Sequence, residues 1–357
     1  MAQNRINIEH PASKMTKITS ALAIAAALGL CACQNQLLKQ AEYFERNGQP
    51  GKAETVLVQH LAQHPEDGRA QYQLAELYGA QKKFAEMIEA LAAAEKHGGR
   101  LRESALQLKE KYWRETYNEG VRALLLEQPP EAVTALQHAT LILPERHAAY
   151  PVLGAALLSH QQTTAAQAVF EQACRLDPDD LDSRHALLRI YFDRGLYEQA
   201  IAASDEALRL LRNDLSALRC RALSLERMAS ANASDSLNLA AENALKRLLS
   251  VSLSMEDFAA LGAHYYRRGD FRNAALQFED AARLGRDNKD VLRYLGDCAW
   301  QLGDYATMSK WYTRLVQSHP NDVEALQNLL IAEQALGRKN EVQKLQSQLQ
   351  QLQGSIE

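Results

Sequence analysis

The sequence is short of aromatic residues, of excess charge of one sign and of long apolar runs. Only 6% of its 357 residues are aromatic while 46% are hydrophobic, so Ala and Leu supply most of the expected core. Its 40 Lys and Arg face 44 Asp and Glu, and this mildly acidic balance lacks the basic footprint of general nucleic-acid binding. No segment alternates apolar and polar residues as half-buried strands do. We therefore expect a helical protein that does not bind nucleic acid.

Motifs of catalysis and metal binding are also missing. The chain has no Gly-rich phosphate loop, nucleophile elbow or metalloprotease helix. His60 and His64, four residues apart near the end of a predicted helix, could share a metal ion, but no third ligand is near them in sequence. We expect no enzyme, no cofactor, no metal and no small-molecule substrate. The alternative from another class is an enzyme subunit whose dispersed side chains meet in a cryptic metal or hydrolytic site.

Cysteine is scarce beyond the first 33 residues. Only Cys174, Cys220 and Cys298 remain there, an odd number spread over helices far apart in the sequence. A disulfide needs two Cα atoms within about 7 Å, so a bridge among these three is not expected. We interpret them as small buried apolar residues, with Cys220 at the offset closest to solvent.

What the sequence does have is a repeat of about 34 residues. Three clear copies occupy 147–180, 255–288 and 289–322. The first of them has small and large apolar residues at fixed offsets: Tyr150, Leu153, Gly154, Leu157, Ala166, Phe170, Ala173 and the closing Pro178. Gly or Ala at a helix crossing lets two helices approach closely, and large residues fill the remaining gaps. The spacing resembles that of the tetratricopeptide repeat, which implies an all-α, right-handed superhelical solenoid built from helix-turn-helix units.

Extending the register along the chain predicts about nine units. We expect them to stack on one another, because one unit cannot bury its apolar face without neighbours. Units 1 and 2 occupy 34–101, units 3 to 5 occupy 113–214, an expanded unit 6 occupies 215–254, units 7 and 8 occupy 255–322, and a degenerate unit with a C-terminal cap occupies 323–357. The register breaks at 102–112, where good helix formers predict a lengthened helix, and at 228–235, where Ala, Ser and Asn predict a loop inside unit 6. Each insertion could be a plain surface feature or a binding element.

The first residues stand outside this register. Arg5, Lys14 and Lys17 precede an apolar run at 21–30, which is too short to span a bilayer. A basic segment followed by a short apolar core and small residues is typical of a secretory signal peptide. Met15 is an alternative start of the same signal.

The end of this segment, Leu30-Cys31-Ala32-Cys33, resembles the lipobox of bacterial lipoproteins. The resemblance implies that 1–32 are removed and that Cys33 becomes a lipidated first residue, since several acyl chains hold a protein on a membrane stably. Gln34 rather than Asp after Cys33 favours the outer membrane over the inner one in the enteric sorting pattern. An ordinary cleaved signal peptide, an uncleaved anchor and a soluble cytosolic adaptor are the alternatives.

In proteins of this family the first helix of each unit lines a concave groove. The predicted groove offsets from unit 5 onward are rich in Arg and aromatic residues, the composition of binding hot spots. These are Arg189, Phe192, Arg219, Arg227, Tyr266, Arg267, Arg293, Tyr294 and Trp300. Such a groove would suit a partner segment with acidic residues. Alternatively, Phe192 and Trp300 could pack against an adjacent helix.

The resulting hypothesis is a non-enzymatic, lipid-anchored scaffold on the periplasmic face of the bacterial outer membrane. By resemblance, such lipoproteins bind envelope proteins or peptide segments during type IV pilus or secretin biogenesis or exopolysaccharide export. Recruitment of peptidoglycan enzymes or of outer-membrane assembly factors is the alternative of the same class.

Overall fold

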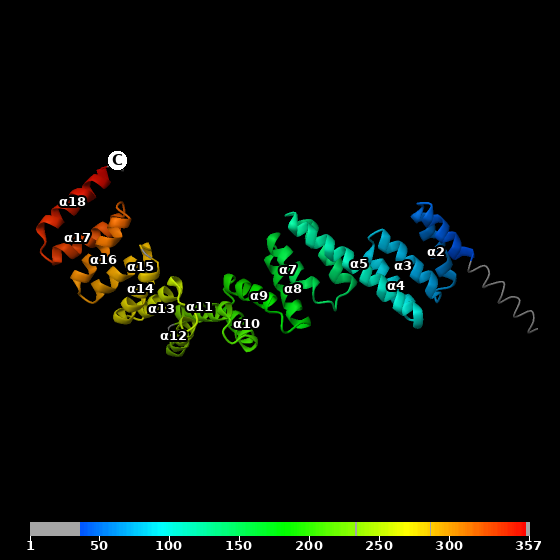
Figure 1. The fold of residues 1–357 in the computed structure, drawn as a ribbon, viewed down its shortest axis with the longest axis horizontal. Coiled ribbons are helices and arrows are strands. Elements are labelled where there is room, and N and C mark those ends of the chain that lie inside the picture. Colours follow the sequence, from blue (N-terminus) through cyan, green and yellow to red (C-terminus); the bar gives the residue numbers. More distant parts are fainter. Residues whose placement is uncertain (1–35, 233, 286, 355–357) are drawn as a thin grey trace, which may run out of the picture. The chain divides into compact units, whose positions relative to one another are not determined.

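The computed structural model describes residues 36–232, 234–285 and 287–354, and all regular secondary structure in these ranges is helical. Successive helices form antiparallel pairs joined by short turns (Figure 1). The all-α repeat fold predicted from the sequence period is thus confirmed. The proposed signal segment and Cys33 lie outside the described residues.

The chain divides into two compact units, Met1–Leu176 and Asp177–Glu357. In the first unit residues 36–46 are helical and precede seven helices, α2 (Pro50–Gln63), α3 (Gly68–Ala80), α4 (Phe84–Glu95), α5 (Gly99–Leu125), α6 (Pro129–Ile142), α7 (Ala149–Ser159) and α8 (Thr163–Leu176). The pairs α3 with α4, α5 with α6, and α7 with α8 pack most closely.

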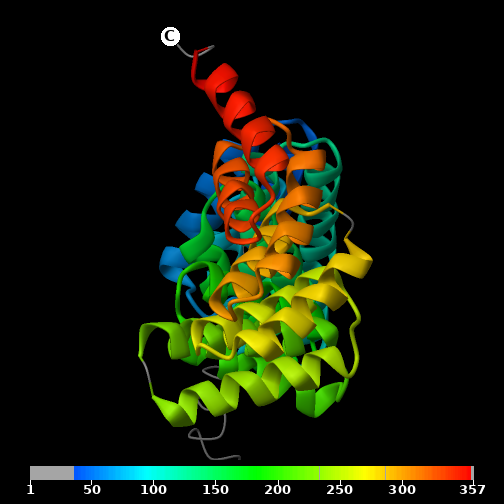
Figure 2. The same ribbon diagram turned by 90° about the vertical axis from the view of Figure 1, so that its left-hand side faces the viewer.

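The second unit contains α9 (Leu181–Asp193), α10 (Tyr197–Leu210), α11 (Leu215–Ala231), α12 (Asp235–Leu249), α13 (Met255–Arg267), α14 (Phe271–Leu284), α15 (Lys289–Gln301), α16 (Tyr305–Ser318), α17 (Val323–Ala335) and α18 (Lys339–Gly354). Each helix packs against the next one along the chain, and α18 closes the stack at its C-terminal end (Figure 2). Among the described residues, no helix combines the length and apolar character needed to cross a membrane.

The two predicted breaks of register differ in outcome. Residues 102–112 lie inside α5, which runs for 27 residues without interruption. The loop predicted at 228–235 is shorter than expected, because α11 continues through Ala231 and α12 begins at Asp235. Ala229 is buried in the core between these two helices, and Ala has the highest helix propensity, so packing and propensity together extend α11 by another turn.

Glycine at the crossing point of a pair makes room for an aromatic ring from the second helix. A Cβ atom on Gly154 would lie 2.5 Å from Cζ of Phe170, and one on Gly296 would lie 2.4 Å from Cε2 of Tyr312. Phe170 and Tyr312 are both buried. The offsets that the repeat assigns to small residues are therefore the points of closest helix approach.

The turn within a pair requires one residue in the left-handed region of backbone conformation. Glycine occupies that position in five of the described turns, at Gly48, Gly195, Gly269, Gly303 and Gly337. In the first unit three other turns have a non-glycine residue with positive φ there, namely Lys82, Glu127 and Gln161. A side chain in this conformation costs roughly 1–2 kcal/mol.

Replacing Gln161 with Gly is therefore expected to raise the free energy of unfolding of the first unit by about 1 kcal/mol. Gln161 has φ 60° and is exposed, so no packing is lost. Urea unfolding followed by circular dichroism measures the change. His160→Gly, next to it at φ −89°, is the control and should give no gain. Equal effects of the two changes would contradict this account of the turn.

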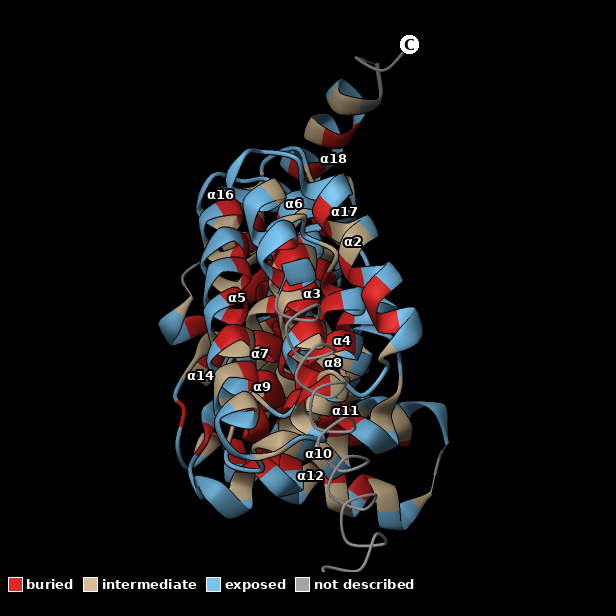
Figure 3. Ribbon diagram, turned by 90° about the vertical axis from the view of Figure 1, so that its right-hand side faces the viewer, coloured by how far each residue is buried: buried red, intermediate tan, exposed pale blue. Residues whose placement is uncertain are grey.

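The core is distributed along the stack. In the ribbon, buried residues lie on the sides of helices that face other helices, and exposed residues lie on the outer sides (Figure 3). Each unit has its own apolar clusters, and the largest in the second unit reaches from α14 to α18. Alanine recurs at fully buried positions, including Ala166, Ala200, Ala274 and Ala325. Small side chains at these points allow helices to approach, which explains a folded core with few aromatic residues.

Candidate partner-binding face

The first helices of the pairs in the second unit, α9, α11, α13, α15 and α17, are linked by side chains that run from one helix to the next. We call the surface formed by these five helices the first-helix face. All nine predicted groove residues belong to these helices. What each can do depends on whether it already has a partner within the protein.

Arg219 on α11 binds Asp257 on α13 through two parallel hydrogen bonds. Its Nε donates to Oδ1 over 2.9 Å and its Nη2 to Oδ2 over 2.8 Å. Asp257 is buried and also accepts a hydrogen bond of 2.6 Å from the Ser252 hydroxyl. Burial alone would raise the pKa of Asp257, but the hydrogen bonds from Arg219, Ser252 and Ser254 outweigh it and leave the pKa below its ordinary value. Arg219 thus joins two first helices.

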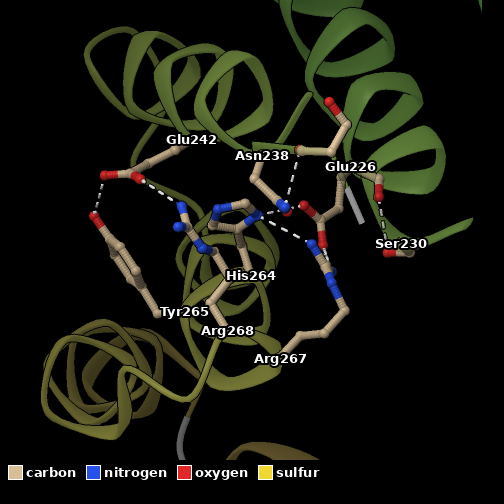
Figure 4. A network of polar contacts seen from close by, with 9 residues as sticks. Glu226, Ser230, Asn238, Glu242, His264, Tyr265, Arg267 and Arg268 are labelled. Carbon is tan, nitrogen blue, oxygen red and sulfur yellow. Dashed lines mark hydrogen bonds and ion pairs between the residues drawn. The ribbon is translucent and has the colours of Figure 1, made fainter. Parts of the chain in front are cut away.

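A second connection between α11 and α13 centres on Glu226. Its Oε2 lies 2.6 Å from Nδ1 of the fully buried His264, and its Oε1 pairs with the guanidinium of Arg267. On the other side, Glu242 of α12 accepts a hydrogen bond of 3.1 Å from the hydroxyl of Tyr265. Figure 4 shows how these side chains from the three helices meet. Arg267, like Arg219, therefore has a carboxylate partner inside the protein.

Aromatic rings connect α13 to α15. The rings of Tyr266 and Tyr294 meet edge to face with centroids 5.3 Å apart, and Tyr294 stacks on Phe278 at 4.8 Å. Tyr266 also meets Phe271 edge to face at 5.3 Å. Tyr294 keeps 37% of its surface exposed, so part of this aromatic group is open to a ligand.

Arg293 on α15 reaches α17. Its Nη2 lies 3.5 Å from Oδ2 of Asp322, the residue that caps α17, and 3.2 Å from Oε2 of Glu324. Lys289 approaches the same Asp322 oxygen at 2.9 Å. Burial favours a higher pKa for Asp322, but the Lys289 hydrogen bond and the cap N–H bond lower it overall. Replacing Arg293 would thus disturb the α15–α17 junction as well as any bound partner.

The remaining predicted residues are less engaged. Phe192 is half-buried against Tyr197 with ring centroids 5.8 Å apart, and exposed Arg189 approaches Asp193 at 3.8 Å on its own helix. Arg227 and Trp300 are exposed, and within the described chain they make no ion pair or ring contact. Trp300 keeps 51% of its surface in solvent. It is the largest apolar group that the second unit leaves open on this face.

Two features of the first helices were missed by the sequence analysis. Ile331 on α17 is 46% exposed, and it follows Trp300 by about one repeat. In the first unit, Glu42, Glu45 and Glu76 lie on neighbouring first helices. Burial, with repulsion from the other two carboxylates, raises the pKa of Glu76 despite its hydrogen bond with Tyr72. The repeat offset that places Ile331 on this face also places Glu42 and Glu76 there. Extending the offset analysis to every unit could have found all of them.

His60 and His64 do not have the arrangement of a metal pair. Nε2 of His60 lies 2.9 Å from Oδ2 of Asp67, which also caps α3, and the two imidazole rings lie with centroids 4.9 Å apart. The described residues contain no group of three His, Cys, Asp or Glu side chains that could hold a metal ion. The imidazole of His60 thus connects α2 to the start of α3.

Cys174, Cys220 and Cys298 form no disulfide, as expected from their positions in the sequence. Cys298 is buried, and burial raises the pKa of its thiol to about 12. Cys220 is half-buried like Cys174, and its thiol lies 3.5 Å from the carbonyl oxygen of Leu188. Burial raises the pKa of Cys220 as well, so neither thiol is activated for redox chemistry.

Comparison with known families agrees with the geometry of the stack. A family model described as tetratricopeptide repeat matches residues 152–214 and 259–328, and a second model of the same description matches 35–77. The chain contains tetratricopeptide repeats. None of the curated proteins compared with this sequence matches it. Tetratricopeptide repeats form scaffolds for protein interaction, which is the class of function shown for this chain.

Several solved structures share the repeat fold at low identity. PilW, described as a widely conserved type IV pilus biogenesis factor, is 18% identical with a TM-score of 0.46, over 61% of this chain and 98% of its own. Pseudomonas aeruginosa PilF is 15% identical with a TM-score of 0.45, over 61% and 97%. YrrB, described as having an unusual peptide-binding site, is 17% identical with a TM-score of 0.46, over 55% and 98%. Likenesses at this level assign no partner to this chain.

Proposed function

We propose that this protein is a non-enzymatic scaffold that binds a segment of a partner protein along the first-helix face of its second unit. The observation that carries the proposal is Trp300, half exposed on α15, the first helix that also carries Tyr294. Trp is among the residue types enriched in binding hot spots, and Ile331 on α17 is a second exposed apolar side chain on a first helix.

The partner chemistry differs from the acidic segment that the Arg-rich composition suggested. Arg219, Arg267 and Arg293 are already paired with carboxylates of the protein itself. A ligand carboxylate would have to displace these internal partners, whereas an apolar or aromatic side chain can cover Trp300 without breaking any contact. We therefore propose a partner segment whose anchors are apolar.

The test compares two exposed apolar positions of the second unit. Replacing Trp300 with Ala is expected to weaken partner binding by at least tenfold, because truncating a hot-spot residue costs about 2 kcal/mol or more. Leu276→Ala on α14, a second helix, is the control, since Leu276 is 56% exposed. Partner recovery from cells and the melting curve of each variant are measured together. Loss of helical structure in Trp300→Ala, or equal recovery by both variants, would contradict the proposal.

The cellular setting is proposed from the sequence. We propose a lipoprotein anchored through Cys33 to the outer membrane and facing the periplasm, with a role in type IV pilus or secretin biogenesis or in exopolysaccharide export. The lipobox-like Leu30-Cys31-Ala32-Cys33 followed by an interaction scaffold supports this proposal. Labelling cells with a radioactive fatty acid should mark the wild type and leave Cys33→Ala unlabelled. An unlabelled wild type in the soluble fraction would exclude the lipoprotein.

A further inference from the structure

A recess in the second unit is lined by none of the nine predicted groove residues. Its walls come from α10, α11, α12 and the turn between α10 and α11, and its volume is about 260 Å³. Leu208, Leu218 and Ala244 supply apolar surface. Three arginines, Arg212, Arg221 and Arg247, line the same recess together with one acid, Asp205. The recess therefore combines an apolar wall with an excess of guanidinium groups.

The charges of this recess are not balanced internally. Nε of Arg221 donates to Oδ1 of Asp205 over 2.7 Å, which neutralises one guanidinium. Nη2 of Arg247 donates to two uncharged acceptors, the backbone carbonyl of Arg212 at 3.3 Å and Oδ1 of Asn213 at 3.0 Å. Arg212 is exposed and makes no ion pair within the described part of the chain. Two positive charges, on Arg212 and Arg247, thus remain without a carboxylate.

Exposed leucines lie close to Arg212 in the sequence. Leu211 directly precedes it and Leu215 begins α11, and they are 49% and 39% exposed. Leu218 in the recess is buried and Leu208 is half-buried. A ligand that fits here has an apolar side chain to cover these leucines and acidic groups to meet the two arginines. Guanidinium groups bind carboxylates through paired hydrogen bonds, so two carboxylates match the two unneutralised arginines.

We propose that this recess binds a partner protein segment in which two acidic side chains flank an apolar one. The site shares no lining residue with the predicted groove, and the two surfaces could engage different partners. A concave recess fits a side chain better than a membrane surface does, and a chain of formal net charge −4 is not attracted to an anionic bilayer as a whole. A protein segment is therefore the occupant, and a membrane is the competing outcome of the test.

The experiment measures fluorescence anisotropy of a labelled peptide with the core Glu-Leu-Glu, capped at both ends, on the purified protein. Peptides with Gln-Leu-Gln and Glu-Ser-Glu cores are the ligand controls. The first peptide is expected to bind with a Kd below about 1 mM, and each control to bind at least tenfold more weakly. The affinity should also fall with added salt, since the contacts are ionic. Absence of binding by the Glu-Leu-Glu peptide up to that concentration would overturn the proposal.

Variants locate the binding on the protein. The double change Arg212→Gln and Arg247→Gln is expected to lower the affinity for the Glu-Leu-Glu peptide at least tenfold. Arg209→Gln is the matched control, because Arg209 lies on α10, is 75% exposed and pairs with Glu206 outside the recess. Equal loss in the double variant and in the control would overturn the proposal.

Charge reversal keeps the test decisive if the neutral variants change stability. The variant with both Arg212→Glu and Arg247→Glu should no longer bind the Glu-Leu-Glu peptide and should bind a Lys-Leu-Lys peptide instead. A variant that does not switch its preference between the two peptides would contradict the proposed site. Sedimentation with vesicles of anionic phospholipid is the last arm: arginine-dependent binding to vesicles without binding to the peptide would replace the protein segment with a membrane.

Discussion

Replacing Gly154 with Leu is expected to lower the free energy of unfolding of the first unit by about 3 kcal/mol or more. Already the first side-chain atom would lie 2.5 Å from Cζ and 2.6 Å from Cε1 of Phe170, whose ring is buried. An aromatic ring cannot yield by rotating a flexible end, so α7 and α8 have to separate. Inserting side-chain atoms into a well-packed core costs about 1–3 kcal/mol and sometimes more.

Gly51→Leu is the matched control for this change. Gly51 lies in the first turn of α2 of the same unit, and a Cβ atom there would meet nothing within 4 Å. Removing a helical glycine at an open site is expected to raise stability by up to about 1 kcal/mol. Urea unfolding followed by far-ultraviolet circular dichroism distinguishes the two. A Gly154→Leu protein as stable as the wild type would show that the two helices do not cross at this glycine.

Replacing Glu226 with Ala is expected to destabilise the second unit by about 3 kcal/mol. Glu226 is the carboxylate partner of both His264 and Arg267, and His264 is fully buried. The imidazole would lose its hydrogen-bond acceptor in a place that water does not reach, and an unpaired buried polar group is costly. Asp280→Ala is the control: Asp280 pairs with Arg283 on the surface of α14, where such a pair contributes well under about 1 kcal/mol.

The Glu226 contribution also has a defined pH dependence. Burial favours a raised pKa for Glu226, but the hydrogen bonds from His264 and Arg267 outweigh it, and the folded-state pKa lies below the ordinary value. The stabilisation is therefore complete above the unfolded-state pKa of about 4.3 and is lost as the pH falls through the lower folded-state pKa. The stability difference between wild type and Glu226→Gln should shrink below about pH 4. A difference that grows on acidification would contradict this assignment.

Most of the fold could be predicted from the sequence, because the same packing pattern recurs in successive units. Gly154 and Gly296 occupy the same offset in different units, and each meets an aromatic ring of the second helix of its pair. One unit read correctly thus predicts the others. The loop predicted at 228–235, which is shorter in the structure, lies in the expanded unit 6, where the regular 34-residue register fails and burial of Ala229 extends α11.

The binding face was less predictable. The position of a residue in the repeat indicates on which side of its helix it lies, but not which side chain of the neighbouring helix it meets. Arg219 and Arg267 each find their carboxylates about one repeat away, at Asp257 and Glu226. Trp300 occupies an equivalent surface and has no such partner within the described chain. Only the structure shows that these arginines join helices and that Trp300 is open to a ligand.

The central claim is that the first-helix face of the second unit binds a partner protein, and crosslinking in cells tests it most directly. A photoreactive amino acid replaces Trp300 in one strain and Leu276 in another, and mass spectrometry identifies what each one captures. The account predicts one discrete envelope protein captured from position 300 and missing from position 276. Capture of only this chain's own helices from position 300, or of the same proteins from both positions, would contradict it.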